Sequence, residues 1–277
     1  QHAKGCRDKF TADDRYGYRF GGGEMKELKL QSKDIKKGNL ILINSSHSIL
    51  KDAENDDLKE AFPGCHDILL EKRTADMLFL ALNHIHSGNR IVPVSGYRSD
   101  KEQCSLYSDS LMENGKEYTR KFVAVPGCSE HQTGLAIDLG KNKPDIDYIC
   151  PDFPYNGICQ AFREDAANFG FIERYPEGSE RITNIAQEPW HFRFVGYPHS
   201  YLIMEKGLTL EEYTDYIKDF TYKRTHLKIN SGGQYFEIFY VPVSPSRPAY
   251  VDIPDDATYA VSGNNVDGVV VTLRTVR

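Results

Sequence analysis

Two short segments of the sequence place imidazole and carboxylate side chains at spacings that could hold a metal ion. The first contains His131 and Asp138, seven residues apart, and the second contains Glu188 and His191. Two imidazoles and one carboxylate, with a fourth coordination position left open, form the donor set of a catalytic zinc ion. We therefore expect His131, Asp138 and His191 to bind Zn²⁺.

Glu188, the remaining carboxylate, is then free to transfer protons. Zinc lowers the pKa of a bound water toward about 7, and a nearby carboxylate can take that proton and pass it to a leaving amine. Pro189 excludes the interior of a helix, so Glu188 and His191 belong to a loop that enters a strand. A single histidine is often only a hydrogen-bonded core residue, but the combination predicts a hydrolytic metal site.

Both segments resemble the signatures of the zinc D-alanyl-D-alanine peptidases of the VanY/VanX type. Those patterns are S-x-H-x-x-G-x-A-x-D and E-x-W-H, and every fixed position is present here. The corner Ser95-Gly-Tyr-Arg-Ser99 with Gln103, and the stretch Asn39 to Asn44, also match that family, so the resemblance covers about residues 35–205. It implies an α+β fold in which helices flank a small antiparallel sheet, as in Hedgehog-like domains.

The resemblance also implies an activity and roles. The substrate would be a peptidoglycan stem peptide ending in D-Ala-D-Ala, with His131, Asp138 and His191 on zinc and Glu188 as general acid/base. The enzyme would share its substrate with serine-type D-Ala-D-Ala carboxypeptidases but would depend on a metal. Such trimming removes the target of glycopeptide antibiotics such as vancomycin or remodels the cell wall. The L,D-carboxypeptidase branch of the family, which acts on tetrapeptide stems, is an alternative that the motifs do not separate.

Four further residues are expected at the substrate. By the resemblance, Arg98 stabilises the charge that develops on the scissile carbonyl oxygen, and its permanently charged planar guanidinium suits that role. Gln103 and Ser129 are hydrogen-bonding candidates for the terminal carboxylate of the peptide, with local capping or loop bonds as the alternative. Trp190, the only tryptophan, forms a wall of the site or packs beneath it.

Other functions have weaker support in the sequence. Ser48 and Lys51 fit the S-x-x-K pattern of serine peptidases, but this spacing arises readily by chance and no K-T-G follows. His84 and His86 are two residues apart on a predicted helix and so do not face each other. A cell-wall binding module without turnover is a third alternative, which the presence of Glu188 and all three ligands disfavours.

The predicted elements would bring these residues together. Alternation along a strand from Gly134 to Leu139 sends Asp138 away from the apolar face. Ser99 and Glu102 form a capping box, which predicts a helix from there to Asn114. The other predicted helices span 69–85, 156–169 and 209–219, and the other predicted strands span 40–43, 91–94, 171–174 and 190–195.

The 277 residues suggest three parts: a flexible arm over 1–23, a catalytic domain over 24–220, and a small all-β module over 221–277. The net charge of −6 disfavours a nucleic-acid partner. The motifs leave the oligomeric state open.

The cysteines and the start of the chain bear on location. Six cysteines without a C-x-x-C pair argue against a Cys-rich zinc knuckle, and Cys150 with Cys159 is the best candidate bridge if the protein works outside the cell. The chain starts at Gln1 without an initiator Met. We expect that a leader or membrane anchor preceded it, and that the protein acts outside a bacterial cell or at its surface.

Overall fold

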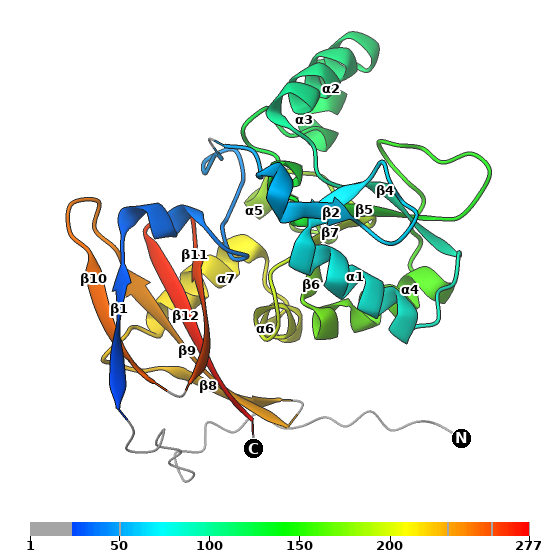
Figure 1. The fold of residues 1–277 in the computed structure, drawn as a ribbon. Coiled ribbons are helices and arrows are strands. Elements are labelled where there is room, and N and C mark those ends of the chain that lie inside the picture. The colour runs from blue at the N-terminus through cyan, green and yellow to red at the C-terminus, as the bar shows by residue number, and fades with distance from the viewer. Residues whose placement is uncertain (1–23, 50, 232, 256, 277) are drawn as a thin grey trace.

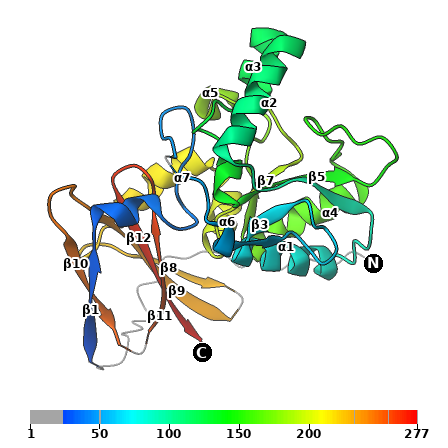
Figure 2. The same ribbon diagram turned by 45° about the horizontal axis from the view of Figure 1, so that its top comes forward.

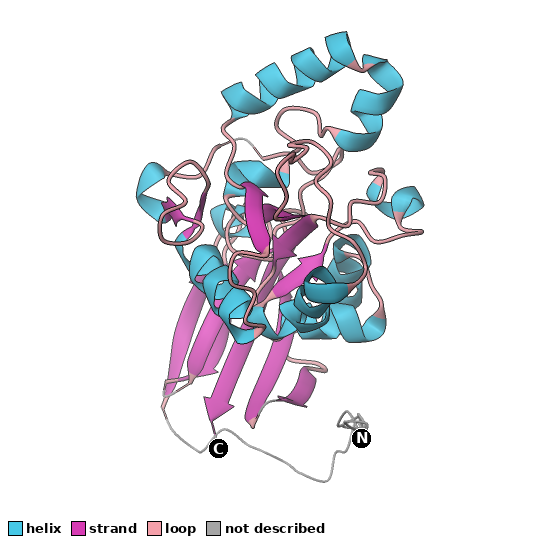
Figure 3. Cartoon of the chain, turned by 90° about the vertical axis from the view of Figure 1, so that its right-hand side faces the viewer, coloured by secondary structure: helices cyan, strands magenta, loops and turns pink. Residues whose placement is uncertain are grey.

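The computed structural model describes residues 24–49, 51–231, 233–255 and 257–276 and consists of a helix-rich part beside an all-β part (Figure 1). The predicted N-terminal arm and Cys6 lie outside the described residues. Helices gather around a small sheet in the first part, and long strands make up the second (Figure 3).

A four-stranded antiparallel sheet forms the centre of the helix-rich part. Its order is β4-β5-β7-β6, comprising β4 (Ile91–Ser95), β5 (Ala136–Lys141), β7 (His191–Phe194) and β6 (Phe171–Glu173). Helices α1 (Lys72–His84) and α4 (Gly157–Asp165) contribute buried side chains to the core at this sheet. Edge-to-face contacts among Phe153, Phe162 and Phe192 fill that core. The arrangement of helices around a small antiparallel sheet confirms the predicted α+β fold.

The remaining elements of this part frame the sheet. Helix α2 (Asp100–Glu113) begins at the predicted capping box of Ser99 and Glu102 and continues into α3 (Gly115–Phe122), and the pair projects from the body (Figure 2). The others are β2 (Leu58–Glu60), β3 (Leu69–Glu71), α5 (Glu180–Thr183), α6 (His199–Lys206), α7 (Leu210–Tyr216), and the 3-10 helices η2 (Asn55–Asp57), η3 (Glu130–Thr133) and η4 (Ala166–Phe169). Two more 3-10 helices contact the all-β part: η1 (Ser32–Lys36) near the start of the described chain and η5 (Ile217–Asp219) directly after α7.

The C-terminal strands form the predicted additional sheet. A four-stranded sheet has the order β11-β12-β9-β8, with β8 (Leu227–Ser231), β9 (Gln234–Pro242), β11 (Thr258–Gly263) and β12 (Gly268–Val276). Strand β10 (Ala249–Pro254) instead pairs with β1 (Met25–Leu30) from the start of the described chain. The N-terminal strand therefore pairs with the C-terminal module, although the sequence grouped it with the catalytic domain.

One of the buried apolar clusters is shared by the two parts. A single buried cluster combines side chains of the helix-rich part with side chains of the β-module. Its buried members are Leu40, Leu42, Ile172, Val195, Leu202, Ile203, Leu210, Tyr213, Ile217, Ile229, Phe236, Ile238 and Val270.

Two local predictions are wrong. Residues 40–43 are buried but form no strand, because Leu40 N–H donates to Ser262 Oγ and Leu42 N–H to Asn264 O, two contacts with the β-module instead of a ladder. Cys150 and Cys159 are both free thiols: Cys159 is buried in the core, and Cys150 Sγ lies 3.4 Å from Tyr118 Oη. None of the described helices has the length and apolar character needed to cross a membrane.

Candidate active site

Three neighbouring strands position the carboxylate of Asp138. In the sheet register, Asp138 on β5 lies opposite His191 on β7 and opposite Ser95 on β4. Ile137 and Leu139 point into the apolar core, as the alternation predicted, and Asp138 lines a cavity of about 390 Å³. Asp138 and His191 therefore meet because of the register of the paired strands.

His131 reaches the same point from a tight turn. Helix η3 is followed by Gly134, where φ is +71° and a Cβ would lie only 2.8 Å from the backbone nitrogen of Glu71. Only glycine fits this turn without strain, and the turn brings the chain back into β5. His131 Nδ1 lies 2.7 Å from Gly96 O, which leaves Nε2 facing Asp138 Oδ2 at 3.3 Å.

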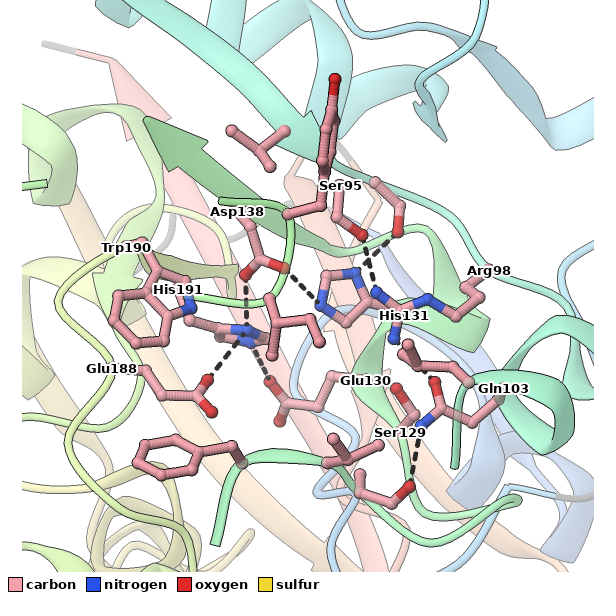
Figure 4. A pocket seen from close by; sticks show the side chains of 18 of the residues that line it. Ser95, Arg98, Gln103, Ser129, Glu130, His131, Asp138, Glu188, Trp190 and His191 are labelled. Carbon is pink, nitrogen blue, oxygen red and sulfur yellow. Dashed lines mark hydrogen bonds and ion pairs between the residues drawn. The ribbon is translucent and has the colours of Figure 1, made fainter. Parts of the chain in front are cut away.

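His131, Asp138 and His191 form the one group in the described part of the chain that could hold a metal ion. One ligand atom from each lies within 4.8 Å of the others, and all three side chains are buried (Figure 4). His191 Nδ1 is 3.0 Å from Asp138 Oδ1, an oxygen that has no hydrogen-bond partner among the described residues. A buried carboxylate oxygen without a hydrogen bond, converging with two imidazole nitrogens, would suit a zinc ion.

The charges in the site are set by burial and by the neighbouring groups. Burial opposes ionisation of Asp138, but His131 and His191 outweigh it and hold the pKa of this carboxyl well below its usual range. Burial also disfavours a charge on His191, but Asp138, Glu130 and Glu188 raise its pKa to about 10. Because a metal replaces the proton on a ligating imidazole, binding of the cation here would release protons.

Glu188 stands beside this group but is not part of it. Its Oε2 lies 3.5 Å from His191 Nδ1, and its backbone N–H donates to Tyr175 O. Burial, together with the charges of Asp138 and Glu130, raises the pKa of Glu188 to about 8. A carboxyl with this pKa can both accept and release a proton near neutral pH.

Arg98 is held at the cavity by two neighbours. Its Nη2 donates to Ser95 Oγ and its Nη1 to Gln103 Oε1, both at 2.7 Å. The amide nitrogen of Gln103 donates to Ala124 O at 2.7 Å, so both ends of this side chain are bonded within the protein. Gln103 therefore orients Arg98 in this structure, and its contact with the terminal carboxylate of a peptide stays a prediction.

The other predicted residues are distributed as follows. Ser129 and Trp190 line the cavity, and Trp190 also packs against the apolar core. Ser48 is exposed and lies outside the residues that line the cavity. His84 pairs with Asp165 on the surface. The structure thus brings together every predicted site residue and separates the alternative serine and histidine pairs from them.

Sequence reasoning missed Glu130 and Tyr175. Glu130 occupies an unspecified position of the S-x-H motif, yet it is buried beside His191 and forms ion pairs with Arg174 and Arg193. The Tyr175 ring lies 5.0 Å from the His191 ring and lines the cavity. An acidic residue directly beside a predicted ligand was the only available signal for Glu130.

Comparisons with known proteins show which family this chain resembles. Residues 68–197 match the family model described as "VanY: D-alanyl-D-alanine carboxypeptidase". The chain is 46% identical over 179 residues to the bifunctional D-Ala-D-Ala dipeptidase and carboxypeptidase VanXYC of Enterococcus gallinarum, a match that covers 64% of this chain and 94% of that protein.

Two solved structures are also similar. The vancomycin-resistance D,D-dipeptidase VanXYg, in complex with a D-Ala-D-Ala phosphinate analogue, has a TM-score of 0.88 and 47% identity, and the match covers 91% of this chain and 100% of that chain. A mutant of the D,D-pentapeptidase VanY from a VanB-type resistance cassette, in complex with Zn(II), has a TM-score of 0.53 and 29% identity over 63% of this chain and 98% of that chain. The chain belongs to the VanY family of D-alanyl-D-alanine carboxypeptidases.

Proposed function

We propose that this protein is a zinc-dependent D,D-carboxypeptidase that removes the terminal D-Ala from peptidoglycan peptides ending in D-Ala-D-Ala. The observation that carries the proposal is the convergence of His131, Asp138 and His191 on one point, with Glu188 beside them. A family relative is described in complex with Zn(II), which supports zinc as the metal. Trimming of this kind would give the protein a role in vancomycin resistance or in cell-wall remodelling.

In this proposal His131, Asp138 and His191 hold zinc, which when bound supplies a Lewis acid and lowers the pKa of water toward about 7. Glu188 accepts a proton from the attacking water and donates it to the leaving amine of D-Ala. Burial raises the pKa of Glu188 above the usual range of a carboxyl, which favours return of the proton to the leaving amine.

Arg98 stabilises the negative charge that develops on the scissile carbonyl oxygen. Ser95 and Gln103 fix its guanidinium before the substrate arrives, so little reorganisation accompanies the reaction. Ser129 and Trp190 line the same cavity. We assign them to the bound peptide, Ser129 as a hydrogen-bonding group and Trp190 as a wall.

Removal and return of the metal tests the proposal. Dialysis against a chelator should abolish hydrolysis of a stem pentapeptide, and one equivalent of zinc per chain should restore it. Benzylpenicillin should leave the activity intact, since no serine nucleophile takes part. Full activity in excess chelator, with no metal found by elemental analysis, would overturn the proposal.

Hydrolysis of the free dipeptide D-Ala-D-Ala is a second candidate activity. It is favoured by the similarity to VanXYC and VanXYg, which are described as dipeptidases. Chromatography of the products from the pentapeptide, the tetrapeptide and the free dipeptide, offered side by side, separates the candidates. Release of D-Ala from the tetrapeptide alone would favour the L,D-carboxypeptidase alternative.

We also propose that the protein acts outside the cell or at its surface, where mature peptidoglycan lies. Immunodetection in cytoplasmic, membrane and secreted fractions of the source bacterium tests this location. Detection in the cytoplasm alone would overturn it.

A further inference from the structure

Two buried polar atoms at the edge of the metal group face each other without any hydrogen bond. They are Glu130 Oε2 and His191 Nε2, which lie 3.6 Å apart (Figure 4). In the described part of the chain neither atom has a hydrogen-bond partner, and the two residues are only 2% and 4% exposed. The separation suits an ion pair, drawn as a dashed line in Figure 4, but is too long for a hydrogen bond. Leaving a buried donor and a buried acceptor without a hydrogen bond is costly, so the facing arrangement of these two atoms calls for an explanation.

The other nitrogen of His191 points toward the metal group. Nδ1 lies 3.0 Å from Asp138 Oδ1 and 3.5 Å from Glu188 Oε2. If Nδ1 binds the metal, the neutral ring must carry its proton on Nε2. That proton points at Glu130, the carboxylate on the opposite side of the ring from the proposed ligand position.

Glu130 is held in place by two buried arginines. Its Oε1 accepts from Arg174 Nε at 2.9 Å and lies 2.7 Å from Arg193 Nη1. Arg174 is in turn fixed by Glu211, with contacts of 2.7 and 2.9 Å, and Arg193 donates to the backbone oxygens of Asn39 and Ile41. This frame occupies Oε1 and leaves Oε2 available for His191.

The geometry points to Glu130 as a positioning residue for the metal, an inference that rests on the proposed zinc site. Metal-binding histidines usually donate the second ring N–H to a carboxylate or a backbone oxygen, which fixes the tautomer and increases the basicity of the ligand. His131 has a neutral acceptor for this purpose, Gly96 O at 2.7 Å. His191 has an anionic one, and we expect the 3.6 Å separation to shorten to a hydrogen bond when the metal binds.

Zinc affinity of matched variants tests this role. Glu130→Gln has a single amide oxygen, which cannot serve both the arginines and His191, so the dissociation constant for zinc should rise about 10- to 100-fold. It is measured by competition with a chromophoric chelator on the full chain. Glu211→Gln is the control, because it alters a partner of Arg174 without touching His191, and its zinc affinity should stay within about threefold of wild type.

The outcomes are separable from failure of the proposed function. If the wild-type chain binds no zinc, the proposed function fails. If the wild-type chain binds zinc and Glu130→Gln binds it equally well, only the role of Glu130 fails. Equal losses in both variants would place the effect in the arginine cluster and would also overturn the inference.

A second measurement needs no variant and covers the case in which Glu130→Gln does not fold. Nitrogen-15 NMR of the zinc-loaded wild-type protein reports which ring nitrogen of His191 carries the proton. We expect the proton on Nε2 and the metal on Nδ1. A proton on Nδ1 would overturn the inference.

Discussion

The surroundings shift the pKa values of two neighbouring carboxyl groups in opposite directions, downward for Asp138 and upward for Glu188. Two imidazoles keep Asp138 ionised, while burial and like charges raise the pKa of Glu188 to about 8. Divergent pKa values of neighbouring acids are how enzymes separate a fixed charge from a proton-transfer group. In the proposed mechanism, environment therefore distinguishes the metal ligand Asp138 from the proton-transfer group Glu188, since both have the same functional group.

Replacement of Glu188 tests this division. Glu188→Gln keeps the size and much of the hydrogen bonding but removes the proton acceptor, so kcat should fall by at least ~10²-fold while zinc stays bound. Steady-state kinetics and metal analysis on the same sample measure both quantities. The exposed Glu177→Gln is the control and should behave as wild type. Loss of the metal from Glu188→Gln would make this residue a ligand instead.

Replacement of Arg98 tests its proposed role in stabilising charge on the scissile carbonyl oxygen. Arg98→Lys keeps the positive charge but loses the planar guanidinium, which donates one hydrogen bond to Ser95 and one to Gln103. Because the charge is then no longer held in place, kcat/KM should fall by roughly 10²-fold. Arg120→Lys, at an exposed position of α3, should leave kcat/KM close to that of wild type. Equal kinetics in the two variants would make Arg98 a structural residue.

At the scale of elements, the sequence predicted correctly those helices and strands that are determined by interactions between residues close in sequence. The capping box at Ser99 and the alternation around Asp138 each predicted an element correctly, because each depends on the nearest residues. Residues 40–43 were predicted as a strand, but their partners lie far along the chain in the β-module. The pairing of β1 with β10 was missed for the same reason.

The same contrast between local and long-range interactions applies to the residues of the candidate site. The candidate ligands His131, Asp138 and His191 were identified because their spacing matches a family motif, whereas Glu130 was missed because its buried position depends on Arg174 and Arg193. No periodicity or spacing in a single sequence marks a residue whose partners are brought in by tertiary structure. The hydrogen bond by which Gln103 orients Arg98 was also missed, because it depends on the folded arrangement of the two side chains.

His199 connects three elements and predicts a pH dependence of stability. Its Nδ1 lies 2.7 Å from Tyr213 Oη on α7, and its Nε2 lies 2.9 Å from Thr272 Oγ1 on β12. Burial lowers the pKa of His199 to about 3, so the folded state holds the ring neutral. Because the unfolded state takes up a proton near pH ~6.5, this contribution is complete above that pH and is lost as the pH falls toward about 3.

The comparison uses His199→Gln, whose amide can still donate and accept. The stability advantage of wild type over the variant should shrink by about 1.4 kcal/mol per pH unit between about pH 6 and 4. Urea unfolding of both proteins at several pH values gives the free energy of unfolding. An advantage that is constant over this range would show that His199 does not titrate on unfolding.

At the scale of the whole molecule, the catalytic residues and the C-terminal module are separate in sequence but continuous in packing. The matched family region ends at residue 197, and every proposed site residue lies before Phe220. VanXYC matches this chain over 94% of its own length with only 179 residues, whereas the match to VanXYg extends over 91% of this chain. A peptidase of this family thus needs no module of this size in general, although this chain has one packed into its core.

The shared core predicts that this chain unfolds as one unit. Ile238 on β9 is fully buried in the cluster that also contains Leu202, Leu210 and Tyr213 of the helix-rich part. Ile238→Ala should therefore lower the free energy of unfolding by about 2–5 kcal/mol, a large share of the roughly 5–15 kcal/mol typical of a native protein. Calorimetry should show a single transition moved to lower temperature, while kcat on a soluble peptide, measured well below that transition, stays close to that of wild type.

The control for that experiment is Val266→Ala, at a partly exposed position of the same module, which should leave the transition unchanged. Because the module supplies Ile229, Phe236, Ile238 and Val270 to the common cluster, a chain ending at Phe220 should lose zinc-dependent activity through unfolding and not through loss of a catalytic group. A truncated chain that stays folded at wild-type stability, or two separate calorimetric transitions in Ile238→Ala, would show instead that the module is an independent domain resting on the peptidase.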